Sequence, residues 1–300
     1  MVLIAREYKE NLYKEKICIV MGIFCVLLVF NIQLINAGEY FQIGTSPNKH
    51  NIGGYSFGNS KKCVIVIGGI HGRYEENTIY IANRLIDYCG RNEQNLSVTV
   101  KIIPNLNPDA FRYELNDPIL KTNGSLIRFN GNSVDLNRNW YTPDWRADCV
   151  YSFNDVRIRA GGKTPMSEPE IISLSDFILG CKSVYEEIYV ITLHSYVVNK
   201  TEKGSVFPSY IKNSKNEIEV LESSDKLADI FSHDGSFLKN AIFQNYTVTG
   251  EMAYWCGINN IAEVDLEFCN NGDIDEKKTN RSSHWEVFIK CFEFLLEIEN

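Results

Sequence analysis

The sequence predicts an α/β protein with a mixed, mostly parallel central sheet flanked by helices. From Lys62 onward, strand-like and helix-like stretches alternate along the chain, and neither a linker nor an internal repeat divides them. Hydrophobic residues make up 44% of the 300 residues, so the chain can bury a large core. We therefore expect one globular domain over residues 38–300, and we exclude a disordered or collagen-like protein.

The first 37 residues are set apart because they have the pattern of an export segment. Residues 17–37 contain no charged side chain and follow a stretch with four basic residues. The dense apolar part, residues 17–30, is shorter than the roughly 20 residues of a membrane-spanning helix. A cleaved signal peptide, a retained membrane anchor and a buried core helix remain open. The first two predict that residues 38–300 are secreted, or are anchored to the membrane and face the outside.

Charge and cysteine content indicate which partners and cross-links to expect. The formal net charge of −8 repels phosphate backbones, so we expect no nucleic-acid partner. Two of the nine cysteines, Cys18 and Cys25, lie in the export segment, and the remaining seven show no Cys-x-x-Cys spacing. We expect no disulfide framework, although a single bridge stays open.

Four stretches have the composition of strands. The run from Cys63 to Ile70 is apolar until the glycines near its end, which is typical of a strand buried on both faces of a parallel or mixed sheet. The other three predicted strands are residues 96–103, 187–193 and 261–268.

Helices are expected between and after these strands. Apolar residues recur at helical spacing over residues 79–86, and Gly90 is the predicted stop signal. Residues 167–170, with the sequence SEPE, form a capping-box pattern that predicts a helix continuing to about Gly180. The last predicted helix covers residues 285–298.

Chemically active side chains follow two of the strands. His71 comes directly after the first strand, and Glu75 and Glu76 follow it closely. His194 comes directly after the strand 187–193. In open α/β sheets ligands bind beyond the carboxyl ends of strands, and two imidazoles with one carboxylate are the ligand set of a catalytic zinc. The other histidines lie in polar stretches and are expected at the surface: His50, His233 and His284.

The segment Ser133–Trp140, with the sequence SVDLNRNW, resembles the carboxylate-binding segment of the zinc carboxypeptidase (metallocarboxypeptidase, M14) family. The resemblance extends from about Cys63 to Phe268 and keeps the order of the family's motifs. It implies the fold of that family and the hydrolysis of peptides. The other matching segments are GGIHG at 68–72, NPD at 107–109, SEPE at 167–170, LHSY at 193–196, TG at 249–250, Trp255 and NIAEVDLEF at 260–268.

The resemblance implies that His71, Glu75 and His194 bind about one zinc ion per chain. The family's usual spacing is His-x-x-Glu, whereas Tyr74 stands at that place here and the spacing is His-x-x-x-Glu. Either a one-residue bulge presents Glu75, or Glu76 replaces it as the ligand. In a third interpretation both glutamates only favour the positive end of the following helix, and zinc binding is then weak or missing.

The strand 261–268 carries three acids on one face, Glu263, Asp265 and Glu267. The resemblance implies that Glu267 is the catalytic base, which takes a proton from the zinc-bound water and passes it to the leaving amine. Asp265 is the alternative base. Without a catalytic function, the acids would form the solvated face of an edge strand.

The resemblance also implies the residues that bind the substrate. Asn137 and Arg138 match the clamp for its terminal carboxylate, and Arg128 matches the arginine that polarises the scissile carbonyl and steadies the oxyanion. Arg73 stands where some members carry an auxiliary substrate-binding arginine, and Tyr246 resembles the tyrosine that closes over the substrate. Each of these residues taken alone fits an ordinary surface residue, and only their joint order favours these roles.

We therefore expect an exported zinc carboxypeptidase whose substrate is a peptide with a free carboxylate. A cell-wall peptidase or amidase acting on peptidoglycan stem peptides is an alternative, because those substrates also present free carboxylates. A catalytically inactive peptide-binding relative is another, motivated by the altered spacing of His71 and Glu75. Ala253 occupies the place where the family sets side-chain preference, which predicts a roomy pocket without an acidic or basic determinant.

Overall fold

The chain from Ala37 to Asn300 forms one compact unit. The expected export segment, residues 1–37, lies outside the residues that the structure describes. Within the described part of the chain, no helix is both long and apolar enough to cross a membrane. This computed structural model describes residues 38–111, 127–150, 157–197, 204–242, 247–270 and 281–299.

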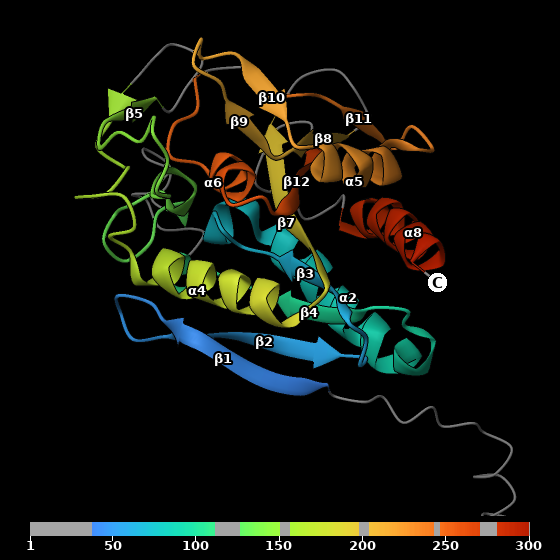
Figure 1. Ribbon diagram of the computed structural model, residues 1–300. Coiled ribbons are helices and arrows are strands. Elements are labelled where there is room, and N and C mark those ends of the chain that lie inside the picture. The colour runs from blue at the N-terminus through green and yellow to red at the C-terminus, as the bar shows by residue number, and fades with distance from the viewer. Residues whose placement is uncertain are drawn as a thin grey trace, which may run out of the picture. The chain divides into compact units, whose positions relative to one another are not determined.

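A central sheet of eight strands runs through the unit (Figure 1). In spatial order the strands are β1 (Glu39–Thr45), β2 (Asn51–Phe57), β4 (Thr99–Ile103), β3 (Lys62–Ile67), β7 (Glu187–Val197), β12 (Ala262–Asn270), β8 (Gly204–Pro208) and β11 (Phe237–Lys239). The strands from β4 through β3 and β7 to β12 are parallel, as are β8 and β11. The pairings β1–β2, β2–β4 and β12–β8 are antiparallel. The predicted mixed, mostly parallel sheet is confirmed.

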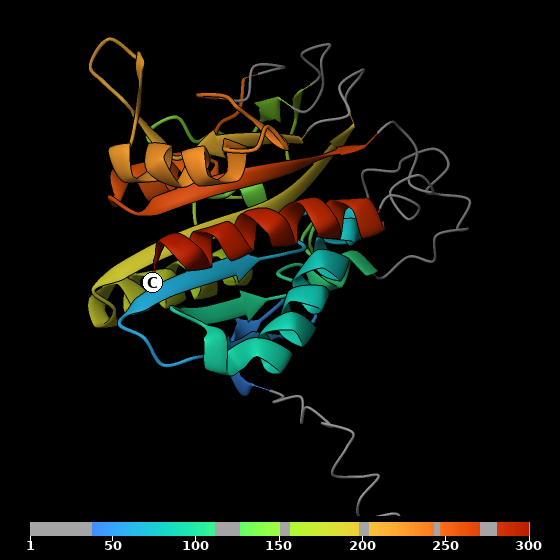
Figure 2. The same cartoon turned by 90° about the vertical axis from the view of Figure 1, so that its right-hand side faces the viewer.

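Helices cover both faces of this sheet (Figures 1 and 2). On one face, α2 (Glu76–Asn92), α5 (Glu222–Ser232) and α8 (Arg281–Ile298) share a hydrophobic cluster with the strands, which we call the α2 cluster. On the other face, α4 (Pro169–Val184) and α6 (Met252–Ile258) share a second one, which we call the α4 cluster. Two short hairpins complete the fold, β9 (Tyr210–Lys212) with β10 (Ile218–Val220) and β5 (Cys149–Val150) with β6 (Arg157–Ile158).

Strand β3 is apolar at nearly every position because both of its faces are buried. Val64 and Val66 belong to the α2 cluster, whereas Cys63, Ile65 and Ile67 belong to the α4 cluster. All five side chains are 0% exposed. Because successive side chains of a strand point to opposite faces, a strand covered on both faces needs apolar residues at every position. The predicted burial of both faces is confirmed.

The ends of several elements differ from the predicted ones. Helix α2 passes through the buried Gly90, which is therefore not a stop signal. The predicted capping box is wrong, because Glu168 is the N-cap of α4 and makes no side-chain cap bond. Instead, Ser167 Oγ donates to Glu168 Oε1 at 2.6 Å. Helix α4 also continues to Val184, because its apolar side chains keep packing against the sheet beyond the predicted end.

His284 is not the surface residue that we expected. It is 8% exposed, with Nε2 at 2.9 Å from the carbonyl oxygen of Cys269 and Nδ1 at 3.3 Å from Asn77 Nδ2. Burial lowers the pKa of His284, so the neutral imidazole joins α8 to the end of β12 and to α2. His50 and His233 are exposed, as expected.

The seven cysteines of the described residues are free thiols. All but Cys269 are buried. In apolar surroundings a free cysteine packs like a small hydrophobic residue. Cys89 and Cys291 pack in this way in the α2 cluster, and Cys63, Cys181 and Cys256 do so in the α4 cluster.

Ile65 provides a test of packing in the α4 cluster. It is 0% exposed in the α4 cluster, so Ile65→Ala should lower the free energy of unfolding by about 2–5 kcal/mol through lost burial and a residual cavity. Ile172→Ala on α4 is the control, because Ile172 is 43% exposed and its truncation should cost about 0.5 kcal/mol or less. Urea unfolding followed by circular dichroism measures both. Equal losses would contradict this packing.

Candidate metal centre and active site

The parallel pairing of β3 and β7 brings two histidines together. His71 follows β3, and His194 lies near the carboxyl end of β7, next to β3 in the sheet. Both side chains are almost completely buried, and their ring centroids lie 5.0 Å apart. The sequence predicted each histidine directly after a strand. In the structure His71 lies four residues beyond the end of β3, and His194 lies within β7, three residues before its end. The two side chains still meet, because β3 and β7 are parallel neighbours.

The extra residue between His71 and Glu75 is taken up by a 3₁₀ helix, η1 (Gly72–Glu75), and not by a β-bulge. Gly72 has φ +52°, and a Cβ there would lie 2.2 Å from the Cβ of Ala110. The turn therefore needs glycine at this position for its backbone angle and for space. Thr78 Oγ1 donates to the carbonyl oxygen of Glu75 at 2.7 Å and fixes the start of α2.

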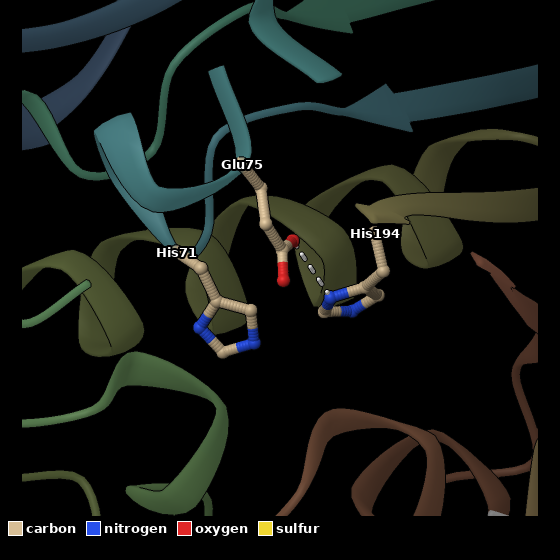
Figure 3. A group of neighbouring side chains, drawn as sticks. All are labelled: His71, Glu75 and His194. Atoms are coloured by element: carbon tan, nitrogen blue, oxygen red, sulfur yellow. Dashed lines mark ion pairs between the residues drawn. The ribbon is translucent and has the colours of Figure 1, made fainter. Parts of the chain in front are cut away.

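Three side chains form a group whose potential ligand atoms all lie within 4.8 Å of one another (Figure 3). The group consists of His71, Glu75 and His194. Glu75 Oε2 lies 3.4 Å from His194 Nδ1. Glu76 is not part of the group, so the geometry favours Glu75 as the third ligand. That ligand role itself stays a prediction.

The charge of this group fits a divalent cation. Burial would raise the pKa of Glu75, but His71, His194 and Arg128 outweigh it and lower the pKa to about 2. The carboxylate is therefore ionised, and its Oε2 is buried without a hydrogen-bond partner among the described residues. A buried anionic oxygen between two imidazoles is the donor set of a catalytic zinc site.

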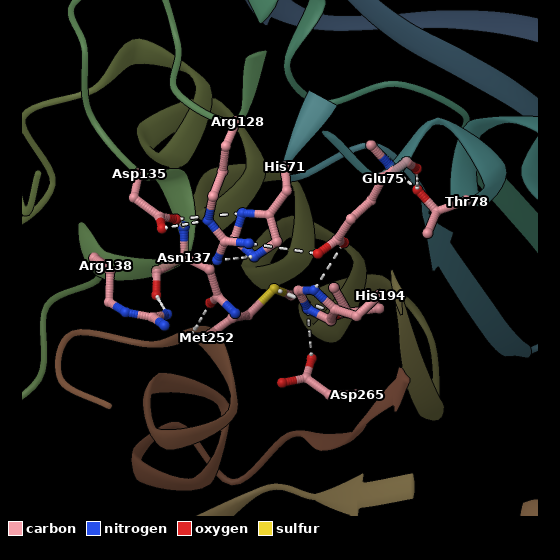
Figure 4. A network of polar contacts seen from close by, with 12 residues as sticks. His71, Glu75, Thr78, Arg128, Asp135, Asn137, Arg138, His194, Met252 and Asp265 are labelled. Atoms are coloured by element: carbon pink, nitrogen blue, oxygen red, sulfur yellow. Dashed lines mark hydrogen bonds and ion pairs between the residues drawn. The ribbon is translucent and has the colours of Figure 1, made fainter. Parts of the chain in front are cut away.

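A carboxylate lies beyond each imidazole (Figure 4). Asp135 Oδ1 is 3.3 Å from His71 Nδ1, and Asp265 Oδ1 is 3.3 Å from His194 Nε2. Histidines that bind metals direct the other ring nitrogen to such a carboxylate, which fixes the orientation of the ring. This geometry leaves Nε2 of His71 and Nδ1 of His194 facing the centre of the group.

Arg128 lies against the same group. Its Nη2 is 2.7 Å from His71 Nε2, its Nη1 donates to Glu75 Oε1 at 3.5 Å, and its Nε donates to Asp135 Oδ2 at 2.9 Å. Burial and the Arg128 charge lower the pKa of His71 to about 4, so this imidazole is neutral near pH 7. A buried guanidinium beside a metal group is placed to stabilise negative charge that develops there.

The short 3₁₀ helix η5 (Leu136–Arg138) holds the predicted carboxylate clamp. Asp135 caps it by accepting from the backbone N–H of Asn137 at 3.0 Å. Asn137 Oδ1 accepts from the backbone N–H of Met252 at 2.9 Å, and Arg138 Nη1 donates to the carbonyl oxygen of Asn137 at 2.6 Å. The clamp is thereby tied to the first residue of α6.

Glu267 lies directly opposite His194 in the pairing of β12 with β7. Burial raises the pKa of Glu267 to about 8, with Glu75 and Asp265 adding to the rise and His194 opposing it. The carboxyl group can therefore gain or lose a proton near neutral pH, as a general acid–base group must. Asp265, the alternative base, contacts His194 instead.

The family model for the zinc carboxypeptidases, Peptidase_M14, matches residues 33–281 of this chain. The chain belongs to the zinc carboxypeptidase family. This is a family of metallopeptidases, and dependence on zinc is a property of the family. The comparison with curated protein sequences found no match.

Solved structures show the same fold. Bovine thrombin-activatable fibrinolysis inhibitor, bound to tick carboxypeptidase inhibitor, has a TM-score of 0.58 at 17% identity, covering 92% of this chain and 96% of that one. Carboxypeptidase A from Helicoverpa armigera has a TM-score of 0.59 at 16% identity, covering 86% of this chain and 68% of that one. The murein-tripeptide amidase MpaA from Escherichia coli O157 has a TM-score of 0.54 at 20% identity, covering 85% and 91%.

The other predicted residues of this family member lie outside the three-residue group, or outside the described part of the chain. The Arg73 guanidinium lies over the ring of Phe111, 5.5 Å from its centroid, and its substrate-binding role stays a prediction. Tyr246 lies outside the described residues. Ala253 is 3% exposed and packs with Tyr210 and Tyr254, and its part in side-chain preference stays a prediction.

The sequence indicated neither the role of Asp135 nor the contact of Asp265 with His194. Asp135 stands within the matched segment 133–140, and its position two residues before Asn137 was the signal available for it. No signal in the sequence connects Asp265 to His194, because that contact depends on the register of β12 against β7.

Glu75 and Glu76 provide a direct test of the metal ligand. Glu75→Gln should weaken zinc binding at least about 10-fold, because the amide removes the anionic oxygen that faces both imidazoles. Glu76→Gln is the matched control, since Glu76 lies outside the group, and its affinity should stay close to that of the wild type. Competition with a chromogenic zinc chelator measures both affinities. If Glu76→Gln weakened zinc binding more than Glu75→Gln did, Glu76 would be the ligand instead.

Proposed function

We propose that this chain is a zinc-dependent carboxypeptidase that hydrolyses the peptide bond before a C-terminal residue. The proposal rests on the convergence of the His71–Glu75–His194 group, Glu267 and the clamp formed by Asn137 and Arg138. A metal group, an acid–base carboxyl and a guanidinium for a substrate carboxylate are together the requirements of an exopeptidase.

Zinc bound to the His71–Glu75–His194 group would supply a Lewis acid that polarises a carbonyl and lowers the pKa of a water molecule. Glu267 takes the proton of the attacking water and passes it to the leaving amine. The pKa of about 8 suits both halves of this transfer near neutral pH. Asp135 and Asp265 hold the two imidazoles in place.

The two arginines act at different parts of the substrate. Arg128, beside His71 and Glu75, stabilises the oxyanion that develops on the scissile carbonyl. Arg138 is 3% exposed and binds the terminal carboxylate, for which a guanidinium provides two parallel hydrogen bonds. The bond that is cut is therefore the one next to the free carboxylate.

Glu267→Gln should lower kcat by a factor on the order of 10² or more without loss of zinc, because the amide cannot accept the proton of the water. Glu186→Gln is the control, since Glu186 is exposed and pairs with Lys61 on the surface. Turnover of a chromogenic peptide and zinc content are measured together. Should Asp265→Asn abolish turnover with full zinc while Glu267→Gln remains active, Asp265 is the base.

The clamp predicts that the substrate needs a free C-terminal carboxylate. Amidating that carboxylate removes the partner of Arg138, and at about 1.5–3 kcal/mol per charge-assisted hydrogen bond kcat/KM should fall at least about 10-fold. Arg138→Lys should impair cleavage of the free acid much more than that of the amide, because an ammonium cannot make the two-pronged contact. Chromatography of the products measures both. Equal cleavage of both peptides at internal bonds would indicate an endopeptidase instead.

A second proposal keeps the metal centre and changes the substrate. The likeness to the murein-tripeptide amidase MpaA, which spans 91% of that chain, favours a peptidoglycan stem peptide as an alternative substrate. Assays on ordinary peptides and stem peptides in parallel distinguish the two. A purified protein without zinc would instead support the inactive peptide-binding relative.

We also propose that the catalytic unit is exported, either secreted or anchored in a membrane and facing the outside. The support is the uncharged stretch 17–37 behind a basic N-terminal stretch. Proteolysis of intact cells tests it: externally added protease should remove the catalytic unit of an anchored form. Protection in intact cells, with no secreted form, would contradict export.

A further inference from the structure

The ion pair of Arg128 with Asp135 joins the two ends of one turn (Figure 4). Arg128 Nε donates to Asp135 Oδ2 at 2.9 Å. The turn between them is closed by the backbone N–H of Asn130, which donates to the carbonyl oxygen of Val134 at 2.9 Å. Arg128 and Asp135 both contact His71, so this turn determines where the guanidinium lies beside the candidate metal group.

The side chain of Asn130 closes the same turn a second time. Its Oδ1 accepts from the backbone N–H of Asn132 and from that of Val134, both at 3.0 Å. Its Nδ2 donates to Glu168 Oε2 at 2.7 Å and to the two carboxyl oxygens of Glu170 at 3.2 and 3.3 Å. A side-chain amide has two donor hydrogens and one oxygen with two lone pairs, so these contacts use the whole amide and fix its orientation.

The two glutamates that accept from Asn130 belong to the start of α4. Glu168 is the N-cap of this helix and Glu170 lies in its first turn. All three side chains are buried. Burial raises the pKa of Glu170 to about 7, with Glu168 and Asp109 adding to the rise and Asn130 opposing it. Buried carboxyl groups need hydrogen donors, and the Asn130 amide supplies them without adding charge.

The clamp is joined to the start of α4 through a different amide. Asn139, the residue after Arg138, accepts with its Oδ1 from the backbone N–H of Glu168 at 3.0 Å. Its Nδ2 donates to the carbonyl oxygen of Gly161 at 2.7 Å. Asn130 therefore lies on the side of the arginine beside the metal group, whereas Asn139 lies on the side of the clamp. Changes at the two amides should affect turnover and substrate binding separately.

We propose that Asn130, held by Glu168 and Glu170, is a positioning residue for Arg128. This inference rests on the proposed carboxypeptidase function, in which Arg128 stabilises the oxyanion. The amide ties the turn to α4, and the turn sets the guanidinium against the candidate metal group. Asn130 acts on the reaction through Arg128, so its contribution exists only while that guanidinium is present.

A double-mutant cycle tests whether Asn130 acts through Arg128. Asn130→Ala should lower kcat at least about 10-fold in the wild type, because a guanidinium displaced by about 1 Å stabilises the transition state poorly. In the Arg128→Ala background the same change should alter kcat less than about 2-fold, since no guanidinium is left to position. KM and zinc content should stay close to those of the parent protein, because the clamp and the metal group are unchanged.

Asn213→Ala is a matched control. Asn213 Nδ2 donates to Glu217 and Glu219, and its Oδ1 accepts from the backbone N–H groups of Lys215 and Glu217. The same kind of amide network thus occurs on the turn between β9 and β10, where its loss should leave kcat unchanged. Asn130→Ser is a second variant, which keeps one hydroxyl in case the alanine variant does not fold. Its kcat should lie between those of the wild type and Asn130→Ala.

The outcomes separate this inference from the proposed function. Unchanged kcat in Asn130→Ala, or equal falls in the two backgrounds, overturns the inference and leaves the carboxypeptidase intact. A rise in KM as large as the fall in kcat does the same, as does a failure of both Asn130 variants to fold and bind zinc, because the residue is then only structural. Full activity of Arg128→Ala removes the oxyanion role and, with it, the inference. A zinc-loaded wild type that cleaves none of the peptides overturns the proposed function itself.

Discussion

The parallel pairing of β3, β7 and β12 is the constraint on which the active site depends. Parallel neighbours end at the same edge of the sheet, so three strands deliver His71, His194 and Glu267 to one place. The α2 and α4 clusters fix the register by burying alternate side chains on opposite faces. A slip of one residue in β12 would turn Glu267 toward the α2 cluster. The register that packs the core is therefore also the register that places Glu267 beside the two histidines.

The buried charges of the site are tolerated because opposite charges alternate. Arg128 lies between Glu75 and Asp135, which removes much of the cost of burying three ionised groups. The pKa of Asp135 stays well below its usual range, because Arg128 and His71 outweigh the effect of burial. The Glu75 carboxylate faces two imidazoles, which is the donor set that the proposed zinc ion would use.

The sequence predicted the parts of the fold that depend on local pattern. The burial of β3 on both faces and the presence of strands just before His71 and around His194 followed from apolar runs, although the exact strand ends did not. The predictions of a capping box at Ser167 and of a surface position for His284 were wrong. Ser167 Oγ accepts from Asn139 Nδ2 and donates to Glu168, and His284 contacts the carbonyl oxygen of Cys269. Contacts between distant segments, such as that of Asp265 with His194, have no local sequence pattern to reveal them.

Asp135 joins the metal group to the substrate clamp. Its Oδ1 accepts from the backbone N–H of Asn137 and lies 3.3 Å from His71 Nδ1, while its Oδ2 accepts from Arg128 Nε. The two oxygens of one carboxylate keep a fixed separation, so these three partners cannot shift independently. In the proposed function, a substrate carboxylate held at the clamp would therefore be positioned by the same buried group that orients His71 and Arg128.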